Sequence, residues 1–346
     1  MRQCGIERHA VNGGGAVRIG NVEIAGRVAL APMSGVTDIH ARRIASRFGA
    51  AMVVCEMVAS EAYVHGAEEA RIRAEGQGID PHIVQLAGCR AGWMADAARM
   101  AQDTGADIVD INMGCPAKHV SGGMAGSALM RDLDHACGLI EAVVGAVEVP
   151  VTVKMRLGWD HAHINAPELA RRAESLGVAA ITVHGRTRQQ FYKGEADWPA
   201  IAAVRAATTL PLIANGDICD ADDARAALAA SGADAVMVGR ATLGKPWLIA
   251  RIEAQLAGLP WAEPDMATKT AAISEHYEGL LSLYGHRVGI RHARKHLAAF
   301  ADHAAEEGHA LAPDARRELV TTTEPARVLA LLHSIVNAPE KIGAAA

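Results

Sequence analysis

Eight short apolar runs recur along the chain, and each is followed by a longer, alanine-rich amphipathic stretch. The runs are rich in β-branched residues and mostly apolar throughout, which is typical of strands buried on both faces. The stretches between them, such as "HARRIASRFGA" and "DDARAALAASGA", have helical spacing and end at a glycine. Alternation of strand and helix eight times predicts an α/β fold, the closed TIM (β/α)8 barrel. The eight runs cover residues 27–33, 51–58, 82–88, 107–114, 151–158, 180–186, 211–217 and 234–240.

An open, doubly wound sheet is the alternative architecture for such a pattern. That fold would usually carry a G-x-G-x-x-G turn after an early strand, and the sequence has none there. Before the first barrel run, "VRIGNVEIAGRVAL" alternates apolar and polar residues around Gly-Asn, which predicts a small hairpin that could plug the bottom of the barrel.

The pattern changes after the eighth run. The linker-like "GLPWAEPD" is followed by "MATKTAAISEHYEGLLSLYGH", "RVGIRHARKHLAAFADHAAEEG" and "PARVLALLHSIVN", which all have helical spacing. We therefore expect an N-terminal arm over residues 1–20, the barrel over 21–259 and an all-helical domain over 260–346.

Composition narrows the class of protein. Half of the 346 residues are hydrophobic and the formal net charge is −5, so a nucleic-acid partner would have to meet a local basic patch. The six cysteines form no CxxC pair, which excludes the usual zinc spacing, and we expect no metal. Without a signal-like N-terminus or a long apolar run, the sequence predicts a soluble, cytoplasmic, reduced protein.

Polar residues gather where the predicted strands end, which is where barrels of this type carry their functional side chains. Each has an ordinary structural interpretation: a strand-end cap, a turn, a structural histidine. Two basic residues at alternate positions of one apolar strand, Lys154 and Arg156, would however face the barrel interior, which is costly unless an anion meets them. Together these residues favour a ligand site at one rim. The residues that we expect at this rim are Pro32, Met33, Ser34, Gln85, Asn112, Cys115, Lys154, Arg156, His184, Arg186, Asn215, Gly216, Asp217, Gly239 and Arg240.

The last two strands indicate what kind of ligand this is. "ANGDI" and "MVGRATLGKP" place Gly216 and Gly239 at strand ends before helices, and Arg240 adds a guanidinium group. Loops at these two places commonly hold a phosphate. A phosphate contact beside amide and lysine side chains suits flavin mononucleotide (FMN), with Lys154 near the electron-rich side of the ring and Gln85 on its pyrimidine edge.

Cys115, in "DINMGCPAKH", could be a core thiol, a metal ligand or a reactive acid at the pocket rim. Partner ligands for a metal are missing nearby in the sequence. A core thiol and a rim acid both stay open at this point; a thiol that starts protonated is a competent general acid.

Several blocks in order resemble the signature motifs of the tRNA-dihydrouridine synthases. They are "APMSGVTD", "VQLAG", "DINMGCPAKHV", "AGSALM", "VKMRLGWD", "TVHGRTRQQFYKGEADW", "IANGDI" and "MVGRATLGKPWLI". The C-terminal "YG…G…ARKHLAAF" resembles the bacterial B-type branch of that family.

The resemblance implies an FMN enzyme that takes hydride from NADPH and reduces the C5–C6 double bond of tRNA uridines, with position 17 of the D-loop as the B-type target. It makes Cys115 the acid that protonates C5 and gives Asn112 the task of positioning the base. It places Arg156 and Arg186 on the substrate or phosphate side, and it implies a monomer. The family's flavin contacts fall on Pro32, Met33, Ser34, Gln85, Lys154, Asn215, Gly216, Asp217, Gly239 and Arg240, with His184 near the flavin.

A tRNA uridine has to be flipped out to reach such a pocket, so the RNA must be gripped. The tail segment "HRVGIRHARKH" places Arg287, Arg291, Arg294 and Lys295 largely on one helix face, where we expect RNA contacts. A solvated charged helix is the alternative. Two rival functions remain at this point: an FMN barrel that reduces a free pyrimidine, and a non-catalytic tRNA-binding protein.

Overall fold

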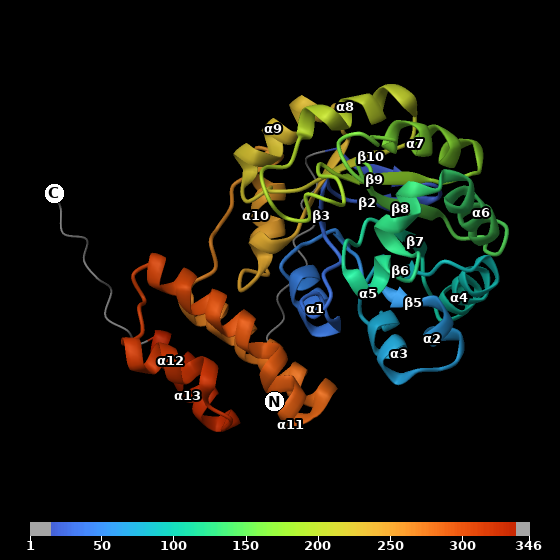
Figure 1. Cartoon of the computed structure of the whole chain (residues 1–346). Coiled ribbons are helices and arrows are strands. Elements are labelled where there is room, and N and C mark those ends of the chain that lie inside the picture. Colours follow the sequence, from blue (N-terminus) through green and yellow to red (C-terminus); the bar gives the residue numbers. More distant parts are fainter. Residues whose placement is uncertain (1–14, 337–346) are drawn as a thin grey trace. The chain divides into compact units, whose positions relative to one another are not determined.

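The computed structural model describes residues 15–336, with only the backbone described at His119 and Ser121 (Figure 1). The chain forms two compact units. The first runs up to Ala241 and also contains Leu248–Pro260; the second comprises Thr242–Trp247 and the chain from Trp261 onward. The predicted domain boundary lay between residues 259 and 260, so the early segment Thr242–Trp247 is an addition to the helical unit.

Nine parallel strands make up the barrel sheet, in the order β4-β3-β11-β10-β9-β8-β7-β6-β5. Seven of the eight predicted runs contain one strand each, and the second run contains β4 and the start of β5. The prediction of a (β/α)8 barrel is thus confirmed. The strands are β3 Val28–Leu30, β4 Met52–Val53, β5 Val58–Ala59, β6 Ile83–Ala87, β7 Ile108–Met113, β8 Val151–Arg156, β9 Ala180–His184, β10 Leu212–Asn215 and β11 Ala235–Val238.

The second strand position is broken between β4 and β5. The circle of strands closes there through an isolated parallel bridge between Val54 and Ile83. At the break, the backbone N–H of Gln85 donates to Sγ of Cys55 at 3.1 Å, while the thiol donates to the Glu56 carbonyl at 3.1 Å. Burial raises the pKa of Cys55 to about 11, so the group stays a thiol. A side-chain sulfur therefore serves as a hydrogen-bond acceptor for a strand amide.

The helices of the first unit surround the sheet (Figure 1). Local signals define their ends: the Asp38 carboxylate caps α1 by accepting from the N–H groups of His40 and Ala41, and Gly232 ends α9 in the left-handed conformation. Their buried faces pack on the outer faces of the strands and form the larger core. These helices are α1 Ile39–Arg47, α2 Ser60–Val64, α3 Glu68–Ala74, α4 Ala91–Asp103, α5 Lys118–Ser121, α6 Leu133–Val144, α7 Ala166–Ser175, α8 Trp198–Ala207, α9 Ala221–Ser231 and α10 Leu248–Leu256, with short 3-10 helices at Gly126–Arg131 and Arg240–Thr242.

The predicted N-terminal hairpin is present as β1 (Val17–Ile19) and β2 (Val22–Ile24), paired antiparallel. Its buried side chains share a second core with residues that begin barrel strands, such as Ile83 and Ile108. The hairpin therefore fills the N-terminal end of the barrel, and ligands must enter at the opposite end.

The second unit consists of α11 (Met266–Glu306), α12 (Pro313–Thr321) and α13 (Pro325–Val336). Gly285 has non-helical backbone angles inside α11 (φ 70°, ψ 163°), which divides it into the two stretches that the sequence predicted. The sequence pattern did not predict α12, because Leu319 is its one buried side chain and leaves almost no apolar period to detect. In the described chain, no helix is both long enough and apolar enough to span a membrane.

Candidate active site

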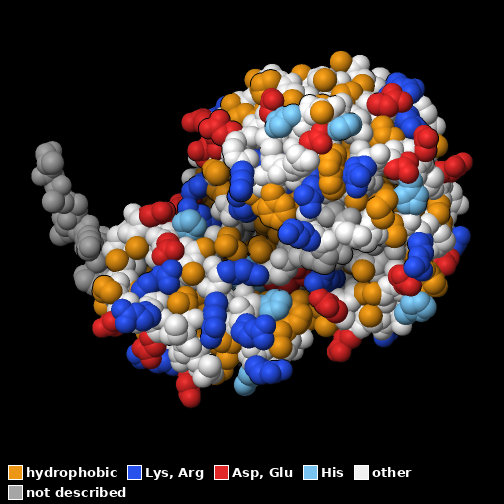
Figure 2. All heavy atoms as spheres, viewed as in Figure 1, with side chains coloured by type: hydrophobic (Ala, Val, Ile, Leu, Met, Phe, Trp, Pro, Cys, Tyr) orange, Lys and Arg blue, Asp and Glu red, His pale blue; other side chains and the backbone are white. Residues whose placement is uncertain are grey.

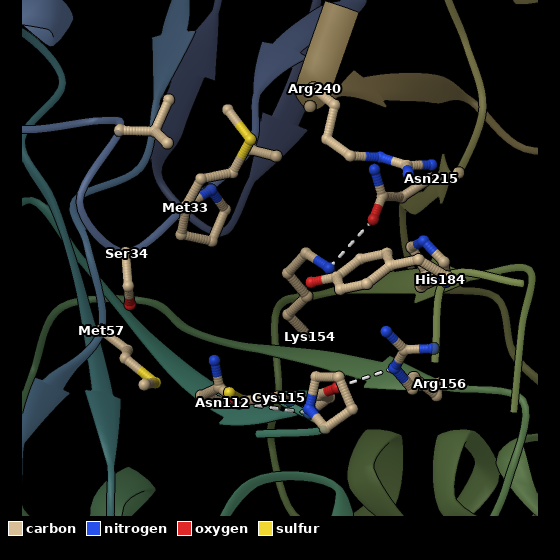
Figure 3. A pocket seen from close by; sticks show the side chains of 18 of the residues that line it. Met33, Ser34, Met57, Asn112, Cys115, Lys154, Arg156, His184, Asn215 and Arg240 are labelled. Atoms are coloured by element: carbon tan, nitrogen blue, oxygen red, sulfur yellow. Dashed lines mark hydrogen bonds between the residues drawn. The ribbon is translucent and has the colours of Figure 1, made fainter. Parts of the chain in front are cut away.

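A cavity of about 690 Å³ opens at the C-terminal ends of the barrel strands (Figure 3). This volume is within the usual range for cofactor sites. Fourteen of the fifteen rim residues named from the sequence line it, and Arg186 is the exception. The lining residues among them are Pro32, Met33, Ser34, Gln85, Asn112, Cys115, Lys154, Arg156, His184, Asn215, Gly216, Asp217, Gly239 and Arg240.

Strand alternation brings the polar side chains together. Positions of equal parity on one strand share a face, so Lys154 and Arg156 of β8 both reach the cavity, as the sequence predicted. The parallel register sets Asn112 opposite Lys154, and Arg156 opposite His184. Neighbouring strands thus deliver amide, ammonium, guanidinium and imidazole groups to one small volume.

Below the cavity, three side chains form a directed hydrogen-bond chain. Gln85 Nε2 donates to Asp110 Oδ2 at 2.7 Å, and Asn112 Nδ2 donates to Gln85 Oε1 at 2.7 Å. Asn112 Oδ1 then accepts the backbone N–H of Cys115 at 2.9 Å. A carboxylate only accepts and a backbone N–H only donates, so both ends force the same orientation on the two amides. We call Asp110, Gln85 and Asn112 the amide relay.

The loop that carries Cys115 is held from both sides. The Cys115 carbonyl accepts from the Ser127 N–H at 3.1 Å and from its hydroxyl at 2.8 Å. Nε of Arg156 donates to the Gly114 carbonyl at 2.8 Å. A Cβ at Gly126 would lie 2.8 Å from the Cys115 oxygen, so only glycine fits there. The thiol of Cys115 consequently has a fixed attachment at the rim of the cavity, with its side chain partly exposed.

Positive charge dominates the cavity wall. Burial, reinforced by Arg156, lowers the pKa of Lys154 to about 8, and Lys154 Nζ donates to Asn215 Oδ1 at 3.0 Å. Burial also lowers the pKa of Arg156 to about 10. The pKa of His184 falls well below its usual value through burial and the nearby Arg156 and Lys154, so the ring is neutral. Its Nδ1 is buried without a hydrogen-bond partner in the described chain. These groups fit an anionic ligand with polar atoms.

Asp217 occupies a special backbone position at the end of β10. Its φ of 55° is left-handed, and the preceding Gly216 (φ 121°) has no room for a Cβ, which would lie 2.8 Å from the Cβ of Ala196. Burial acts to raise the pKa of Asp217, but hydrogen bonds from Arg186 and the Ala196 N–H outweigh it and the pKa is lowered. Arg240 Nη2 also donates to this carboxylate, at 2.9 Å.

Arg186 lies outside the cavity lining, although the sequence placed it on the substrate or phosphate side. Its guanidinium is buried and forms a bidentate pair with Asp217. Further donors reach the Lys193 carbonyl at 3.2 Å and the Gly194 carbonyl at 2.5 Å. With its donors occupied in this way, Arg186 braces the loop after β9 and the end of β10.

Sequence reasoning missed several residues that line the cavity. Tyr192 is the most informative: its ring lies 5.6 Å from the Arg156 guanidinium and 5.0 Å from that of Arg240. The signal available was an aromatic pair, Phe191 and Tyr192, in a rim loop of a chain with only 3% aromatic residues. Met57, from the break in the second strand, and Cys219 also line the cavity and carried no such signal.

The basic residues of the tail lie on α11 in the second unit. Arg287, Arg291, Arg294 and Lys295 are all exposed, and Figure 2 shows blue side chains gathered over this unit. Within the described residues, Arg287 and Arg291 have no carboxylate partner, whereas Arg316 and Arg327 of the same unit are paired with Asp302 and Glu318. The charge of the first two is therefore available to a partner.

A protein-family model described as "Dihydrouridine synthase (Dus)" matches residues 29–338 of this sequence. The chain belongs to the dihydrouridine synthase family. Family membership identifies it as an enzyme, and the family resemblance found in the motifs is confirmed.

Named relatives are similar over nearly their whole length. A "Probable tRNA-dihydrouridine synthase" of Rhizobium leguminosarum bv. phaseoli is 53% identical over 317 residues, covering 92% of this chain and 97% of the relative. One of the same name from Rhodobacter capsulatus is 54% identical over 313 residues, covering 89% and 94%. The "tRNA-dihydrouridine synthase B" of Xanthomonas campestris pv. campestris is 46% identical over 290 residues, covering 83% and 87%.

Solved structures with a similar fold are far more distant in sequence. Histamine dehydrogenase from Rhizobium sp. 4-9 superposes with a TM-score of 0.53 at 14% identity, over 75% of this chain and 50% of the other. A morphinone reductase mutant in complex with tetrahydroNAD gives a TM-score of 0.50 at 17% identity, over 73% and 93%. At these identities the likeness establishes the barrel fold.

Proposed function

We propose that this protein is a tRNA-dihydrouridine synthase that reduces the C5–C6 double bond of D-loop uridines, with FMN as its cofactor and NADPH as the hydride source. The observation that carries the proposal is the position of Cys115. Its loop is fixed by the amide relay at the rim of a cationic cavity that fits an anionic cofactor. The names of the relatives support tRNA as the substrate.

The residues present fit FMN. His184 Nδ1, which has no hydrogen-bond partner among the described residues, and the ammonium of Lys154 are buried polar groups that a bound cofactor would contact. Gly216 and Gly239 leave backbone open at the end that carries Arg240, which suits a phosphate. Bound in this cavity, FMN would supply the hydride that C6 of uracil receives. Asn215 holds Lys154 in place through their 3.0 Å hydrogen bond.

Cys115 completes the reduction as a general acid. The ring gains a hydride at C6 and a proton at C5, so the double bond becomes single and the Cys115 thiol becomes a thiolate that solvent reprotonates. Asn112 donates through Nδ2 to Gln85 and accepts the Cys115 N–H through Oδ1. It therefore positions the acid and also lines the site of the base. Arg156 supports the same loop through Gly114 and reaches the cavity beside Tyr192.

The exposed arginines of α11 support the RNA-binding part of the proposal. Three of these residues recur at helical spacing and are exposed, so they can neutralise phosphates: Arg287, Arg291 and Arg294. A local cationic face is needed because the net charge of −5 gives the chain no general attraction for RNA. Lys295 extends the same face. Position 17 of the D-loop is the finer proposal and rests on the B-type resemblance. The monomeric state rests on the family resemblance in general, and the cytoplasmic location on the cysteine usage of the sequence.

The decisive experiment incubates the FMN-loaded protein with NADPH and tRNA lacking dihydrouridine, followed by mass mapping of the product. We expect dihydrouridine at one D-loop position. Turnover of a free pyrimidine with no change in the tRNA would refute the proposal in favour of a small-molecule reductase. A colourless protein that cannot be reconstituted with FMN would refute it in favour of a non-catalytic RNA-binding role.

A further inference from the structure

Four large hydrophobic side chains are exposed in the described part of the chain. Those that reach solvent are Met124 (49% exposed), Ile164 (43%), Phe191 (41%) and Tyr192 (47%). They belong to the loops after β7, β8 and β9, which are adjacent strands of the sheet. All four therefore lie at the end of the barrel that carries the cavity. Apolar side chains exposed together at the end of a barrel that carries a cavity suit a binding surface.

Two of these residues have an unusual backbone conformation. Met124 has a φ of 64° and Phe191 a φ of 57°, in the left-handed region that non-glycine residues rarely adopt. Such conformations persist where the surrounding structure enforces them, and they concentrate at functional sites. The Phe191 carbonyl accepts a hydrogen bond from Arg156 Nη1 at 2.9 Å, which ties this conformation to the cavity wall.

Backbone hydrogen bonds hold these loops in place. The N–H of Arg188 donates to the Gly158 carbonyl and that of Gln189 to the Trp159 carbonyl, each at 2.9 Å, so the loops after β8 and β9 are joined. The Ala125 N–H, next to Met124, donates to the Val120 carbonyl at 3.3 Å within the loop that also carries Cys115.

Charge around this surface favours a polyanion. Lys118, Arg131 and Lys193 are exposed on the same three loops and form no ion pair with any described residue. These three cations stand beside few acids: Asp160 accepts from His163 Nδ1 at 2.7 Å, Asp197 caps α8 through the Ala200 N–H at 2.9 Å, and Glu195 is exposed beside Gly194.

We propose that Met124, Ile164 and Phe191 form a shelf, here called the rim shelf, on which the unpaired bases flanking the target uridine rest. The proposal rests on the proposed function and adds to it the site that receives the neighbours of the flipped base. Phe191 connects the shelf to the cavity, because its ring makes an edge contact with Tyr192 at a centroid distance of 5.0 Å. Apolar faces match bases without regard to sequence, and Lys118, Arg131 and Lys193 would meet the phosphates.

The test is a double-mutant cycle between protein and RNA. Wild-type protein first identifies the reduced uridine by mass mapping; transcripts with an abasic nucleotide on either side of it are then prepared. Met124→Ser and Ile164→Ser are compared with Met124→Leu and Ile164→Val, which keep the apolar surface. Equal FMN content and melting temperature establish that each variant is folded.

We expect each serine variant to weaken binding of intact tRNA roughly 3- to 10-fold, as loss of a partly buried apolar contact should, with the Leu and Val variants near wild type. On the abasic transcript that removes the matching base, the serine variants should lose less than about twofold further. Additive losses on both abasic transcripts would overturn the shelf, even with a fully active wild type. Absence of dihydrouridine with wild type would instead overturn the proposed function. A change of oligomeric state in the serine variants would assign the surface to a second copy of the chain and also overturn the shelf.

Discussion

Replacing Asp110 by Asn should stabilise the protein at neutral pH. Asp110 is buried, accepts from Thr152 Oγ1 at 2.6 Å and from Gln85 Nε2 at 2.7 Å, and begins the amide relay. An asparagine has the same shape and can keep both contacts, since its oxygen accepts from Gln85 and its NH₂ donates to the Thr152 hydroxyl. The substitution therefore removes a buried charge while preserving the direction of the relay.

The size of the gain follows from the pKa of Asp110. Burial raises this pKa from 3.8 to about 6, although hydrogen bonds from Thr152 and Gln85 oppose the rise. The folded value lies above the unfolded one, so the stability that Asp110 contributes is complete below about pH 4 and is lost as the pH rises through about 6. One unit corresponds to about 1.4 kcal/mol, so the two-unit shift costs the wild type about 3 kcal/mol at pH 8 and about half of that at pH 5.

Urea unfolding of wild type and Asp110→Asn, measured side by side at pH 5 and pH 8, tests this reasoning. The asparagine variant should be more stable at both values, with an advantage that grows between them. An advantage that does not change with pH, or a variant less stable than wild type at pH 8, would show that the buried carboxylate does not lower the free energy of unfolding.

Asp110→Leu is the matched control for the relay. Leucine leaves Gln85 Nε2 and Thr152 Oγ1 without an acceptor, at about 1–3 kcal/mol each, and frees the Gln85 amide to turn. We therefore expect the leucine variant to lose stability and activity on tRNA, whereas the asparagine variant keeps its activity.

Three further predictions concern the cavity and the tail. Cys115→Ala should retain FMN and its reduction by NADPH but slow dihydrouridine formation at least about 100-fold, the usual scale for a general acid. Stopped-flow absorbance follows the reduction of FMN, and nucleoside mass spectrometry follows dihydrouridine formation. Full activity on tRNA would assign the proton to another group. The pKa of Lys154 is about 8, so FMN affinity should fall roughly tenfold per pH unit above 8, which flavin fluorescence can follow. A Lys154→Met variant should lack this dependence. The same pH profile in the variant and the wild type would exclude Lys154 from anion binding. Arg287→Gln and Arg291→Gln should each weaken tRNA binding and reduce its salt slope by about one, while the ion-paired Arg327→Gln should do neither; equal effects in all three would contradict a specific RNA face.

The barrel could be predicted from the sequence because most strands are buried on both faces and are therefore mostly apolar. The same property located the site, since polar residues such as Gln85, Lys154 and His184 gather toward the strand ends that face the cavity. Charge at alternate positions of β8 predicted the inward direction of Lys154 and Arg156 correctly. Short-range pattern was sufficient wherever strand geometry alone decides the direction of a side chain.

Pattern was insufficient where a side chain's partners come from distant segments. The sequence placed Arg186 on the substrate or phosphate side, but Asp217 and the Lys193 carbonyl occupy its donors inside the protein. Asp110 carried no signal of its own, because its role depends on Gln85 of another strand. The break between β4 and β5 was equally hidden, since an apolar run of that length gives no indication that the regular strand is interrupted between Val53 and Val58.

The sulfur contact at that break links two parts of the barrel through one residue. Gln85 donates its backbone N–H to the thiol of Cys55, and its side chain belongs to the amide relay that ends at the loop of Cys115. The hydrogen bond that spans the interrupted strand and the hydrogen bonds that orient the Cys115 loop therefore share a residue. A change at Cys55, which does not line the cavity, would for this reason also reach the loop of Cys115.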